Sequence, residues 1–371
     1  MPEDRPHIVS HTSMRGIAAF LVIGYHLTYS TDLPPLETWT NAFLRGYLWV
    51  DFFFILSGFV MVYVYGPMGA MRGGEARSYY RARIARIYPL HLFTLTILVL
   101  FKLFTIAYAG IFGDPGSIDG ARWGDLPFQL LLVHSWGVLP DTSWNIPSWS
   151  ISAELFAYIL FPSLLALLAR ARAATLAAYA LAGTAFYVWI GSTTGDLDIT
   201  VGFAVLRCLA GFAFGMVLAC VGGVFYRLPD AALSVLQGAA LIGIALCIET
   251  VANDAVVIVP FALLIGATAP DRGAACRLLR APWLRRLGDH SYSIYLIHVP
   301  IITISRFFYN RALTIAGWEQ SLLTQLVWAS LVCAATVVLS AWTYRFIERP
   351  GRDLLMGRLP RRPIARAPAA P

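Results

Sequence analysis

The chain has 371 residues, of which 58% are hydrophobic and 13% are charged. Soluble domains carry about 25% charged and about 45–50% apolar residues, so this composition excludes a soluble domain and predicts a membrane protein with many spans. The formal charge of +7 is compatible with nucleic-acid binding. The positions of the basic residues decide whether this interpretation holds. The cysteines show no metal-binding or disulfide spacing, and we expect small core residues at Cys208, Cys220, Cys247, Cys276 and Cys333.

Apolar runs interrupted by charge predict an all-α polytopic protein with about ten transmembrane helices, since each span needs about 20 apolar residues. The predicted spans are 15–30, 46–65, 87–109, 150–168, 174–191, 200–221, 232–250, 254–270, 290–308 and 321–343. A shorter apolar stretch, 126–139, predicts a short re-entrant or interfacial helix. We expect residues 1–350 to form one membrane domain and residues 351–371 to form a disordered cytoplasmic tail rich in Arg and Pro.

The charges of the loops indicate the orientation of the chain. With both termini in the cytoplasm, 22 of the 28 basic residues lie on cytoplasmic segments. The opposite side receives acidic residues at Asp32, Glu37, Asp114, Asp119, Asp125, Asp141, Asp196, Asp198, Glu249, Asp254 and Glu319. This asymmetry supports ten spans with both ends inside. It also excludes the nucleic-acid interpretation, because the arginines face anionic lipid and cytosol.

The first predicted span carries two ionisable residues, Arg15 and His26. Eleven residues are close to three helical turns, so both side chains lie on one side of the helix, about 16 Å apart along its axis. A guanidinium suits phosphate, and an imidazole can accept and return a proton near neutral pH. The pair therefore fits a substrate with an anionic head and a long neutral arm. Alternatively, Arg15 is a positive-inside anchor and His26 a hydrogen-bonded core residue.

The second predicted span carries Asp51 near its outer end within an aromatic run that indicates core and lipid contacts. Its Ser57-Gly58 pair allows another helix to approach closely. In the arginine-rich stretch that follows, Arg83 and Arg86 are one helical turn apart. They either hold one phosphate between them or form a solvated charged face.

Two further ionisable residues enter predicted spans. Glu154 follows the sequence W-S-I-S-A at the start of the fourth span. Its carboxylate is either capped by backbone N–H groups or is the partner of a histidine or arginine, and we favour the partner. His298 lies in the middle of the ninth span, either as a satisfied core histidine or as a ligand contact.

Taken together, these segments resemble the acyltransferase family 3 membrane proteins, bacterial O-acyltransferases of surface polysaccharides, Nod factors, peptidoglycan and some antibiotics. The resemblance rests on Arg15 followed after ten residues by His26, and on five motifs in family order. These are V-D-x-F-F-x-L-S-G at Val50, R-x-x-R-I-x-P at Arg83, W-S-x-S-x-E at Trp149, S-Y-S-x-Y-L-x-H at Ser291 and Y-R-x-x-E-x-P at Tyr344. They span residues 14–350. Trp49 and Ala153 depart from the usual family residues, and neither removes a polar group.

The resemblance implies transfer of an acyl group, acetyl by default, from cytoplasmic acyl-CoA to a hydroxyl of a carbohydrate or lipid-linked glycan. The reaction would take place at the outer face of a bacterial inner membrane. On this hypothesis Arg15, Arg83 and Arg86 bind the CoA phosphates. His26 acts as general base or as a transient acyl carrier, and Glu154 orients and stabilises its imidazolium.

The resemblance also implies contacts with the reacting groups. Ser150, Ser152 or Tyr292 would donate hydrogen bonds to the thioester oxygen, and Asp51 and His298 would contact substrate. Acyl-CoA is the donor substrate, and we expect neither a metal nor a permanently bound cofactor. No hydrolase-like domain follows the membrane unit in the sequence, so we expect this unit to bind both donor and acceptor.

Two other classes of protein fit part of the sequence. A transporter or flippase of an acyl or glycolipid substrate would also bury charge, but the paired, Gly- or Pro-broken halves common in transporters are not found. A scaffold subunit of a polysaccharide synthase would explain neither the Arg15–His26 pair nor Glu154.

Overall fold

The computed structural model describes residues 7–30, 40–112, 121–250 and 253–357. These residues form helices and no strands, which confirms the all-α prediction. The α-helices are α1 (Val9–Ser30), α3 (Trp49–Tyr65), α4 (Gly74–Phe112), α5 (Leu126–Leu130), α6 (Ser148–Arg170), α7 (Arg172–Thr193), α8 (Ala204–Val221), α9 (Gly223–Arg227), α10 (Asp230–Thr250), α11 (Ile258–Thr268), α12 (Ala274–Leu279), α13 (Pro282–Asp289), α14 (Ser291–Ala316), α15 (Leu322–Thr343) and α16 (Arg349–Leu355).

Seven helical segments in the described residues are long and apolar enough to cross a membrane. They are Gly46–Met68, Gly74–Phe112, Ser148–Arg170, Arg172–Thr193, Ala204–Arg227, Asp230–Thr250 and Leu322–Leu355. The three other predicted spans also fall on helices, namely α1, α14 and the shorter apolar segment Asp254–Thr268. The structure therefore supports a multi-pass membrane protein, with seven such candidates rather than ten.

The stretch 126–139 forms a helix too short to cross a bilayer, as the sequence predicts, although α5 has only five residues. Turns follow it and fold back against α4 and α6. His91 and the Gln129 carbonyl lie 2.8 Å apart, and the Ser152 hydroxyl donates to the Leu132 carbonyl at 2.8 Å. Leu132 itself is fully buried. The stretch is therefore a buried, hydrogen-bonded connection into α6.

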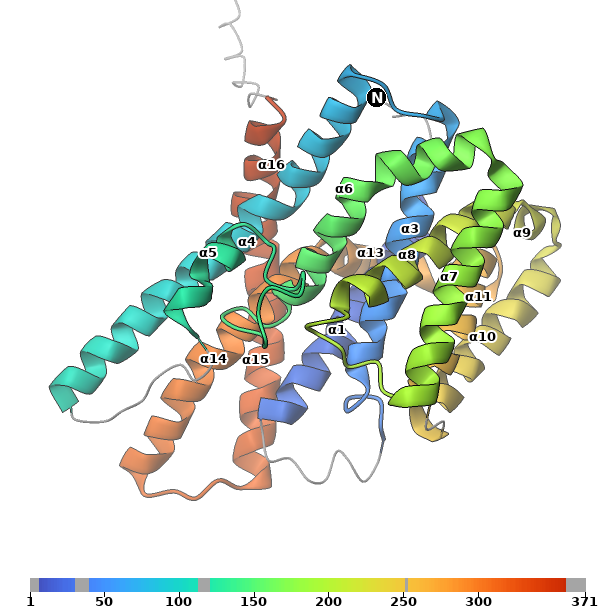
Figure 1. Cartoon of the computed structure of the whole chain (residues 1–371). Coiled ribbons are helices and arrows are strands. Elements are labelled where there is room, and N and C mark those ends of the chain that lie inside the picture. The colour runs from blue at the N-terminus through green and yellow to red at the C-terminus, as the bar shows by residue number, and fades with distance from the viewer. Residues whose placement is uncertain (1–6, 31–39, 113–120, 251–252, 358–371) are drawn as a thin grey trace, which may run out of the picture.

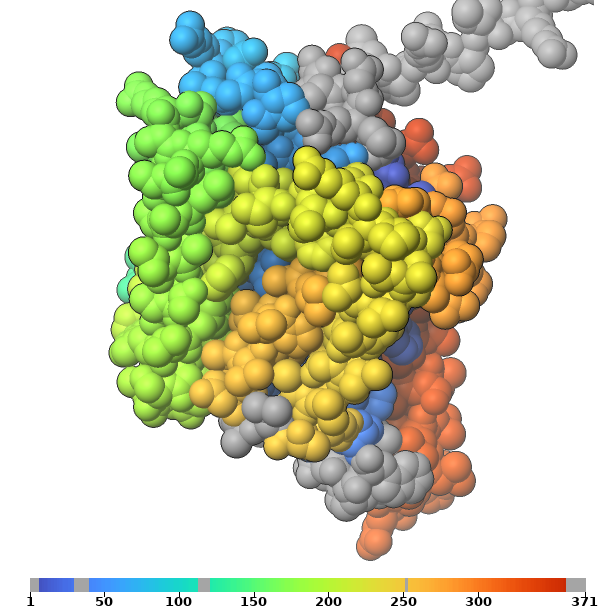
Figure 2. All heavy atoms as spheres, turned by 90° about the vertical axis from the view of Figure 1, so that its right-hand side faces the viewer, coloured from blue at the N-terminus to red at the C-terminus, as the bar shows by residue number. Residues whose placement is uncertain are grey.

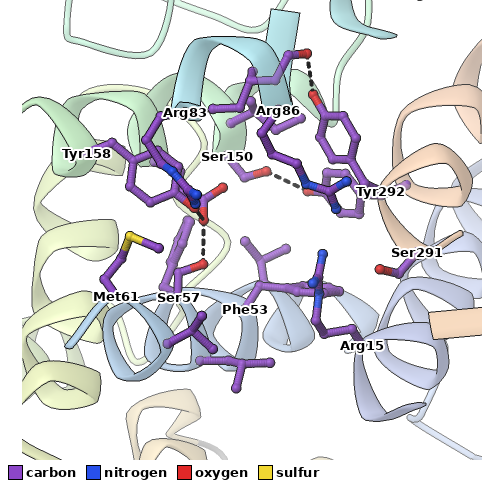
Figure 3. Close-up of a pocket in the computed structure, with 18 residues that line it drawn as sticks. Arg15, Phe53, Ser57, Met61, Arg83, Arg86, Ser150, Tyr158, Ser291 and Tyr292 are labelled. Carbon is purple, nitrogen blue, oxygen red and sulfur yellow. Dashed lines mark hydrogen bonds between the residues drawn. The ribbon is translucent and has the colours of Figure 1, made fainter. Parts of the chain in front are cut away.

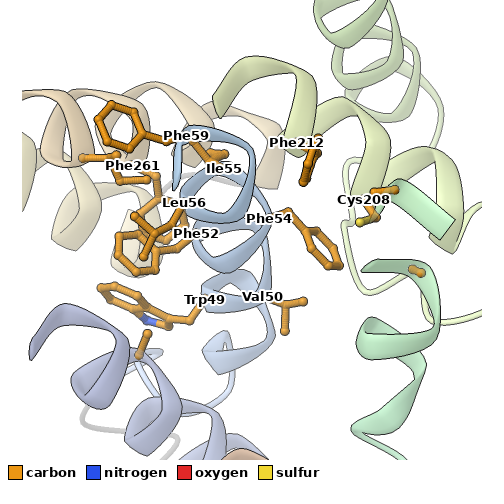
Figure 4. Close-up of a cluster of buried hydrophobic side chains, with 14 of the residues drawn as sticks. Trp49, Val50, Phe52, Phe54, Ile55, Leu56, Phe59, Cys208, Phe212 and Phe261 are labelled. Atoms are coloured by element: carbon orange, nitrogen blue, oxygen red, sulfur yellow. The ribbon is translucent and has the colours of Figure 1, made fainter. Parts of the chain in front are cut away.

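Helices α3 and α8 pack along each other at backbone contact. A Cβ at Gly58 would lie 1.9 Å from the Phe212 carbonyl oxygen, and one at Gly215 would lie 1.9 Å from the Ile55 carbonyl oxygen. Glycine alone allows this approach, which confirms the expectation for the Ser57-Gly58 pair. The aromatic run beside it is buried in the core, as predicted (Figure 4), and includes Trp49, Phe52, Phe54 and Phe59.

Helix α1 lies in the middle of the fold, between α4, α5 and α14 on one side and α7, α10 and α11 on the other (Figure 1). It packs against α3, α13 and α14. Its crossing with α13 is close, since a Cβ at Gly288 would lie 2.0 Å from the Thr12 carbonyl oxygen. Figure 2 shows darker blue atoms, from the first helices of the chain, in the gaps between later segments. Arg15 and His26 therefore face protein on several sides.

The chain beyond α15 continues through a π-helical turn, η5 (Tyr344–Glu348), into α16. The first residues of the predicted tail thus continue a helix, and its remainder, 358–371, lies outside the described residues. Asp32, Glu37, Asp114 and Asp119 also lie outside them. All five cysteines are free, and Cys208, Cys247 and Cys276 are buried.

Candidate active site

Side chains from α1, α3, α4, α6 and α14 line one pocket beside α1. Figure 3 shows Arg15 on one wall and Arg83 and Arg86 on the opposite wall, with their guanidinium groups directed toward the space between. Glu154 also lines this pocket. The structure thus brings together the three arginines that the sequence grouped.

Arg86 is held in place by an acidic residue from the far end of the chain. Its Nη1 forms an ion pair with Glu348 Oε1, and its guanidinium carbon lies 5.0 Å from the centre of the Tyr292 ring. The Ser293 hydroxyl donates to Glu348 Oε2 at 2.8 Å. The π-helical turn η5 ends at Glu348, which is 1% exposed. This carboxylate fixes Arg86 from behind the pocket.

Arg83 lies instead in a cage of aromatic rings. Its guanidinium carbon is 5.9 Å from the ring centres of Tyr65 and Tyr79 and 5.5 Å from that of Tyr158. Such contacts stabilise a cation without neutralising its charge. Neither Arg83 nor Arg15 has an ion pair with a carboxylate among the residues that the structure describes. Both retain N–H groups that can reach a ligand.

The charges around the pocket favour an anionic ligand. Three guanidinium groups and the Glu154 carboxylate line it, and Glu348 neutralises Arg86. The remaining positive charge is surrounded by apolar side chains such as Phe53, Phe54 and Val60. Water screens charges poorly in such a setting, so a phosphate between the arginines gains strong charge-assisted hydrogen bonds.

Glu154 does not orient His26 in this structure. Its Oε1 accepts hydrogen bonds from the Ser57 hydroxyl and from the Tyr158 hydroxyl, the latter at 2.6 Å. His26 Nδ1 instead lies 3.2 Å from Nε2 of His298. The sequence favoured a histidine or an arginine as the partner of Glu154, and the expected pairing with the imidazole is wrong, because α3 and α6 place two hydroxyls at the carboxylate.

His26 and His298 lie just beyond the pocket and do not line it. Tyr295 connects the two regions, since it lines the pocket and its ring centre is 6.0 Å from that of His298. Phe53 packs against Tyr295 with ring centres 5.9 Å apart. The Tyr295 ring therefore borders both the arginine-lined pocket and the histidine pair.

The three hydroxyls predicted to bind the thioester oxygen all donate to backbone carbonyls. Tyr292 donates to the Ile87 carbonyl at 2.7 Å, Ser152 to the Leu132 carbonyl at 2.8 Å, and Ser150 to the Pro147 carbonyl at 3.0 Å. Ser150 Oγ also lies 2.7 Å from the Tyr295 hydroxyl, and both residues line the pocket. Of these hydroxyls, that of Tyr295 is therefore the donor at the pocket that is not bonded to a backbone carbonyl of the described residues.

Asp51 is a structural residue and does not line the pocket. Its carboxylate is completely buried and bonded to Arg207, with Oδ2 2.6 Å from Nη2. Tyr187 also donates to it, at 3.3 Å, and Trp149 lies against the guanidinium at 5.1 Å. The expected substrate contact is corrected to an ion pair between α3 and α8.

Sequence reasoning missed several residues of the site, namely Ser57, Tyr158, Tyr295 and Glu348. Glu348 and Tyr295 lie within motifs that carried the family resemblance, and Ser57 was interpreted only as a small residue for helix contact. Tyr158 follows Glu154 by one helical turn, a spacing at which side chains meet. That spacing was the available signal, whereas no local pattern indicates the contact of Glu348 with Arg86.

Comparisons with known proteins match most of this chain to acyltransferases. The family model described as an acyltransferase domain matches residues 11–345. The acyltransferase MdmB of Streptomyces mycarofaciens is 30% identical, over 99% of this chain and 97% of its own length. The peptidoglycan O-acetyltransferase OatA of Listeria monocytogenes and the O-acetyltransferase OatA of Staphylococcus aureus are each 24% identical, over 94% and 91% of this chain. The chain spans 56% of the length of each of these two relatives. No solved structure matches it.

Proposed function

Because this chain belongs to the acyltransferase family whose model matches residues 11–345, we propose that it transfers an acyl group from cytoplasmic acyl-CoA to a hydroxyl of a glycan. The chain is a membrane O-acyltransferase, and family membership decides against a transporter without chemistry. Our proposal concerns the donor, the acceptor, the site and the orientation in the membrane.

The donor assignment is carried by the guanidinium groups around one pocket. CoA offers several phosphate charges at one end and a long neutral arm that ends in the thioester. Arg15 and Arg83 bind the phosphates, since neither is ion-paired to a carboxylate in the described part of the chain. Arg86 is already paired with Glu348, and it adds positive charge and holds the wall in place.

The neutral arm runs along α1 from Arg15 toward His26. These residues are eleven positions apart, which corresponds to about 16 Å of helix. Phe53 and Tyr295 line the pocket, and Tyr295 also packs against His298, so their rings can pack against the neutral arm. The Tyr295 hydroxyl, 2.7 Å from Ser150 Oγ, then turns to donate to the thioester carbonyl oxygen, while Ser150 stays bonded to the Pro147 carbonyl.

His26 performs the proton transfer. Its Nε2 takes the proton of the acceptor hydroxyl while the hydroxyl oxygen attacks the thioester carbonyl carbon. The carbon–sulfur bond breaks, and the imidazolium returns the proton to the departing thiolate. In a second route, Nε2 attacks the thioester first and the acyl group passes from the ring to the hydroxyl. Both routes end with a neutral imidazole, an ester and CoA.

The acceptor is a carbohydrate or lipid-linked glycan at the outer face of a bacterial inner membrane. Relatives named as peptidoglycan O-acetyltransferases support this class of acceptor, and acetyl is the default acyl group. The charges of the loops favour the orientation with both ends in the cytoplasm. In that orientation the pocket arginines lie toward the cytosol and His26 toward the outside.

The test uses the purified protein in lipid nanodiscs with acetyl-CoA and glycan fragments from the parent cells. We expect release of free CoA that depends on the glycan and an O-acetylated product. A strain that lacks the protein should lose the matching O-acyl group from its surface glycans. If neither CoA release nor a change in glycan acylation is seen, the proposed donor and acceptor are wrong.

A further inference from the structure

We propose that His298 is the positioning residue of His26: its Nε2 accepts a hydrogen bond from His26 Nδ1 and stabilises the imidazolium formed during transfer. This inference rests on the proposed function, in which His26 is the base. The sequence analysis gave this role to Glu154, and here a neutral imidazole has it. His298, which was expected to contact substrate, is instead the partner of the base.

The two imidazoles come from helices far apart in the sequence, α1 and α14, which pack side by side. His298 Nε2 lies 3.2 Å from His26 Nδ1, and the ring centres are 4.9 Å apart. His298 is completely buried, whereas His26 is half-buried. The inner ring is therefore sealed by protein, and the outer ring can meet a substrate.

The backbone contacts fix where the protons lie. His26 Nδ1 is 3.0 Å from the Val22 carbonyl oxygen, and His298 Nδ1 is 3.2 Å from the Ile294 carbonyl oxygen. A carbonyl oxygen only accepts, so both Nδ1 atoms carry hydrogen. Since two N–H groups cannot face each other at hydrogen-bond distance, His298 Nε2 is an acceptor, and the single His26 Nδ1–H is shared between it and the Val22 carbonyl oxygen. His26 Nε2 therefore has a lone pair, with no partner among the described residues.

Besides the Val22 carbonyl, the surroundings leave His298 as the side chain that supports a charged His26. The titratable side chains against the two rings are Tyr25, with its ring centre 5.0 Å from that of His26, and Tyr295. The Tyr25 hydroxyl is directed away, donating to Asp198 at 2.6 Å. In the part of the chain that the structure describes, no carboxylate bonds to either imidazole. An N–H donor becomes stronger when its ring is charged, so the bond to His298 tightens during transfer.

His298 acts through His26 and keeps its own proton. The hydroxyl proton goes to His26 Nε2, and the positive charge spreads over that ring to its Nδ1–H. The Nδ1–H bond to His298 then stabilises this state until Nε2 gives its proton to the thiolate. His298 Nδ1–H stays bonded to Ile294 throughout.

Matched substitutions test this role. His298→Leu keeps the volume but removes the acceptor, and we expect kcat to fall by about tenfold to hundredfold with the KM for acetyl-CoA unchanged. His298→Gln, whose amide oxygen can replace Nε2, should restore much of kcat. His290→Gln is the control, since His290 packs against Tyr344 and not against His26. Equal losses in His298→Leu and His298→Gln, or a raised KM alone, would overturn the proposal.

A second measurement does not depend on acyl transfer. In protein with ¹⁵N-labelled histidine in lipid bilayers, solid-state NMR should show a coupling across the hydrogen bond between a protonated Nδ1 and an unprotonated Nε2. The coupling should vanish in His298→Leu and persist in His290→Gln. Its absence in the wild-type protein contradicts the pairing itself. Failure of the wild-type protein to transfer an acyl group, with the coupling present, would instead contradict the proposed function.

Discussion

Arg83 and Arg86 are one helical turn apart, yet different groups hold them. Tyrosine rings surround Arg83, while Arg86 forms an ion pair with the buried carboxylate of Glu348. Cation–π contacts leave a cation able to bind an anion, whereas an ion pair neutralises it. The two arginines therefore contribute differently to a site for phosphate.

Substitution separates these two contributions. Arg83→Ala should raise the KM for acyl-CoA about tenfold to hundredfold, since a hydrogen bond to a charged group contributes about 1.5–3 kcal/mol, with little loss of stability. Arg86→Ala should also destabilise the protein by about 3–5 kcal/mol, because it leaves Glu348 buried and unpaired. Steady-state kinetics and thermal unfolding in detergent measure the two effects. A similar loss of stability in both variants would show that our division of roles is wrong.

A second prediction for single residues concerns the ion pair of Asp51 and Arg207. Both side chains are completely buried, so Asp51→Asn leaves a charged guanidinium without its counter-charge. We expect a loss of about 3–5 kcal/mol in the free energy of unfolding, measured by denaturant titration in micelles. Asp141→Asn is the matched control, because the Asp141 side chain is 70% exposed and such pairs contribute little. Equal stability of the two variants contradicts the structural role of Asp51.

The sequence singled out several ionisable residues of the predicted spans, but neither the buried Arg207 nor the partners of these residues. Helical spacing along one segment was enough to associate Arg83 with Arg86. The pairings of Arg86 with Glu348 and of His26 with His298 depend on how helices more than 250 residues apart pack. Asp51 looked like a substrate contact because its partner, Arg207, lies in another predicted span.

Helix contacts in this fold depend on glycine at a few crossings. At the α3–α8 contact, Gly58 and Gly215 let each helix touch the backbone of the other. This contact positions α3, which carries Ser57 and Phe53 into the pocket. A shift of α3 would therefore alter both the core and the site.

Gly215→Ala should separate the two helices, because the added methyl would lie 1.9 Å from the Ile55 carbonyl oxygen. We expect a loss of about 1–3 kcal/mol or more and a lowered midpoint of thermal unfolding. Gly238→Ala on α10, where a Cβ meets no atom within 4 Å, should raise stability by about 1 kcal/mol. If both alanine variants behave alike, close backbone contact does not hold α3 against α8.

At the level of elements, the structure has a helix in each of the ten ranges that the hydrophobic runs predicted as spans. They did not predict that α1 begins at Val9, before its apolar run, because that first turn is held by tertiary contacts. His11, for example, lies 3.0 Å from the Ile265 carbonyl. The π-helical turn that ends at Glu348 also has no signal in hydrophobicity.

For the whole molecule, the distribution of charge predicts a single orientation. Helix α7 offers a direct test, because it joins an arginine-containing turn to a loop with acidic residues. In a cysteine-free background, Thr194→Cys should react with a membrane-impermeant maleimide in intact cells. Ala173→Cys should react only after the membrane is opened. Both positions are exposed in the structure, so the reverse labelling pattern would invert the proposed topology.

The account depends on His26 acting on a thioester that the arginine pocket has bound. The most direct measurement is the single-turnover rate of acetyl-CoA cleavage by the reconstituted protein with acceptor present, together with the Kd for acetyl-CoA. We predict that His26→Gln lowers the cleavage rate by about 10²–10⁴-fold. The Kd of the variant for acetyl-CoA should stay within about twofold of the wild-type value, because the arginines that bind the phosphates are unchanged. Unchanged cleavage in His26→Gln would contradict the account.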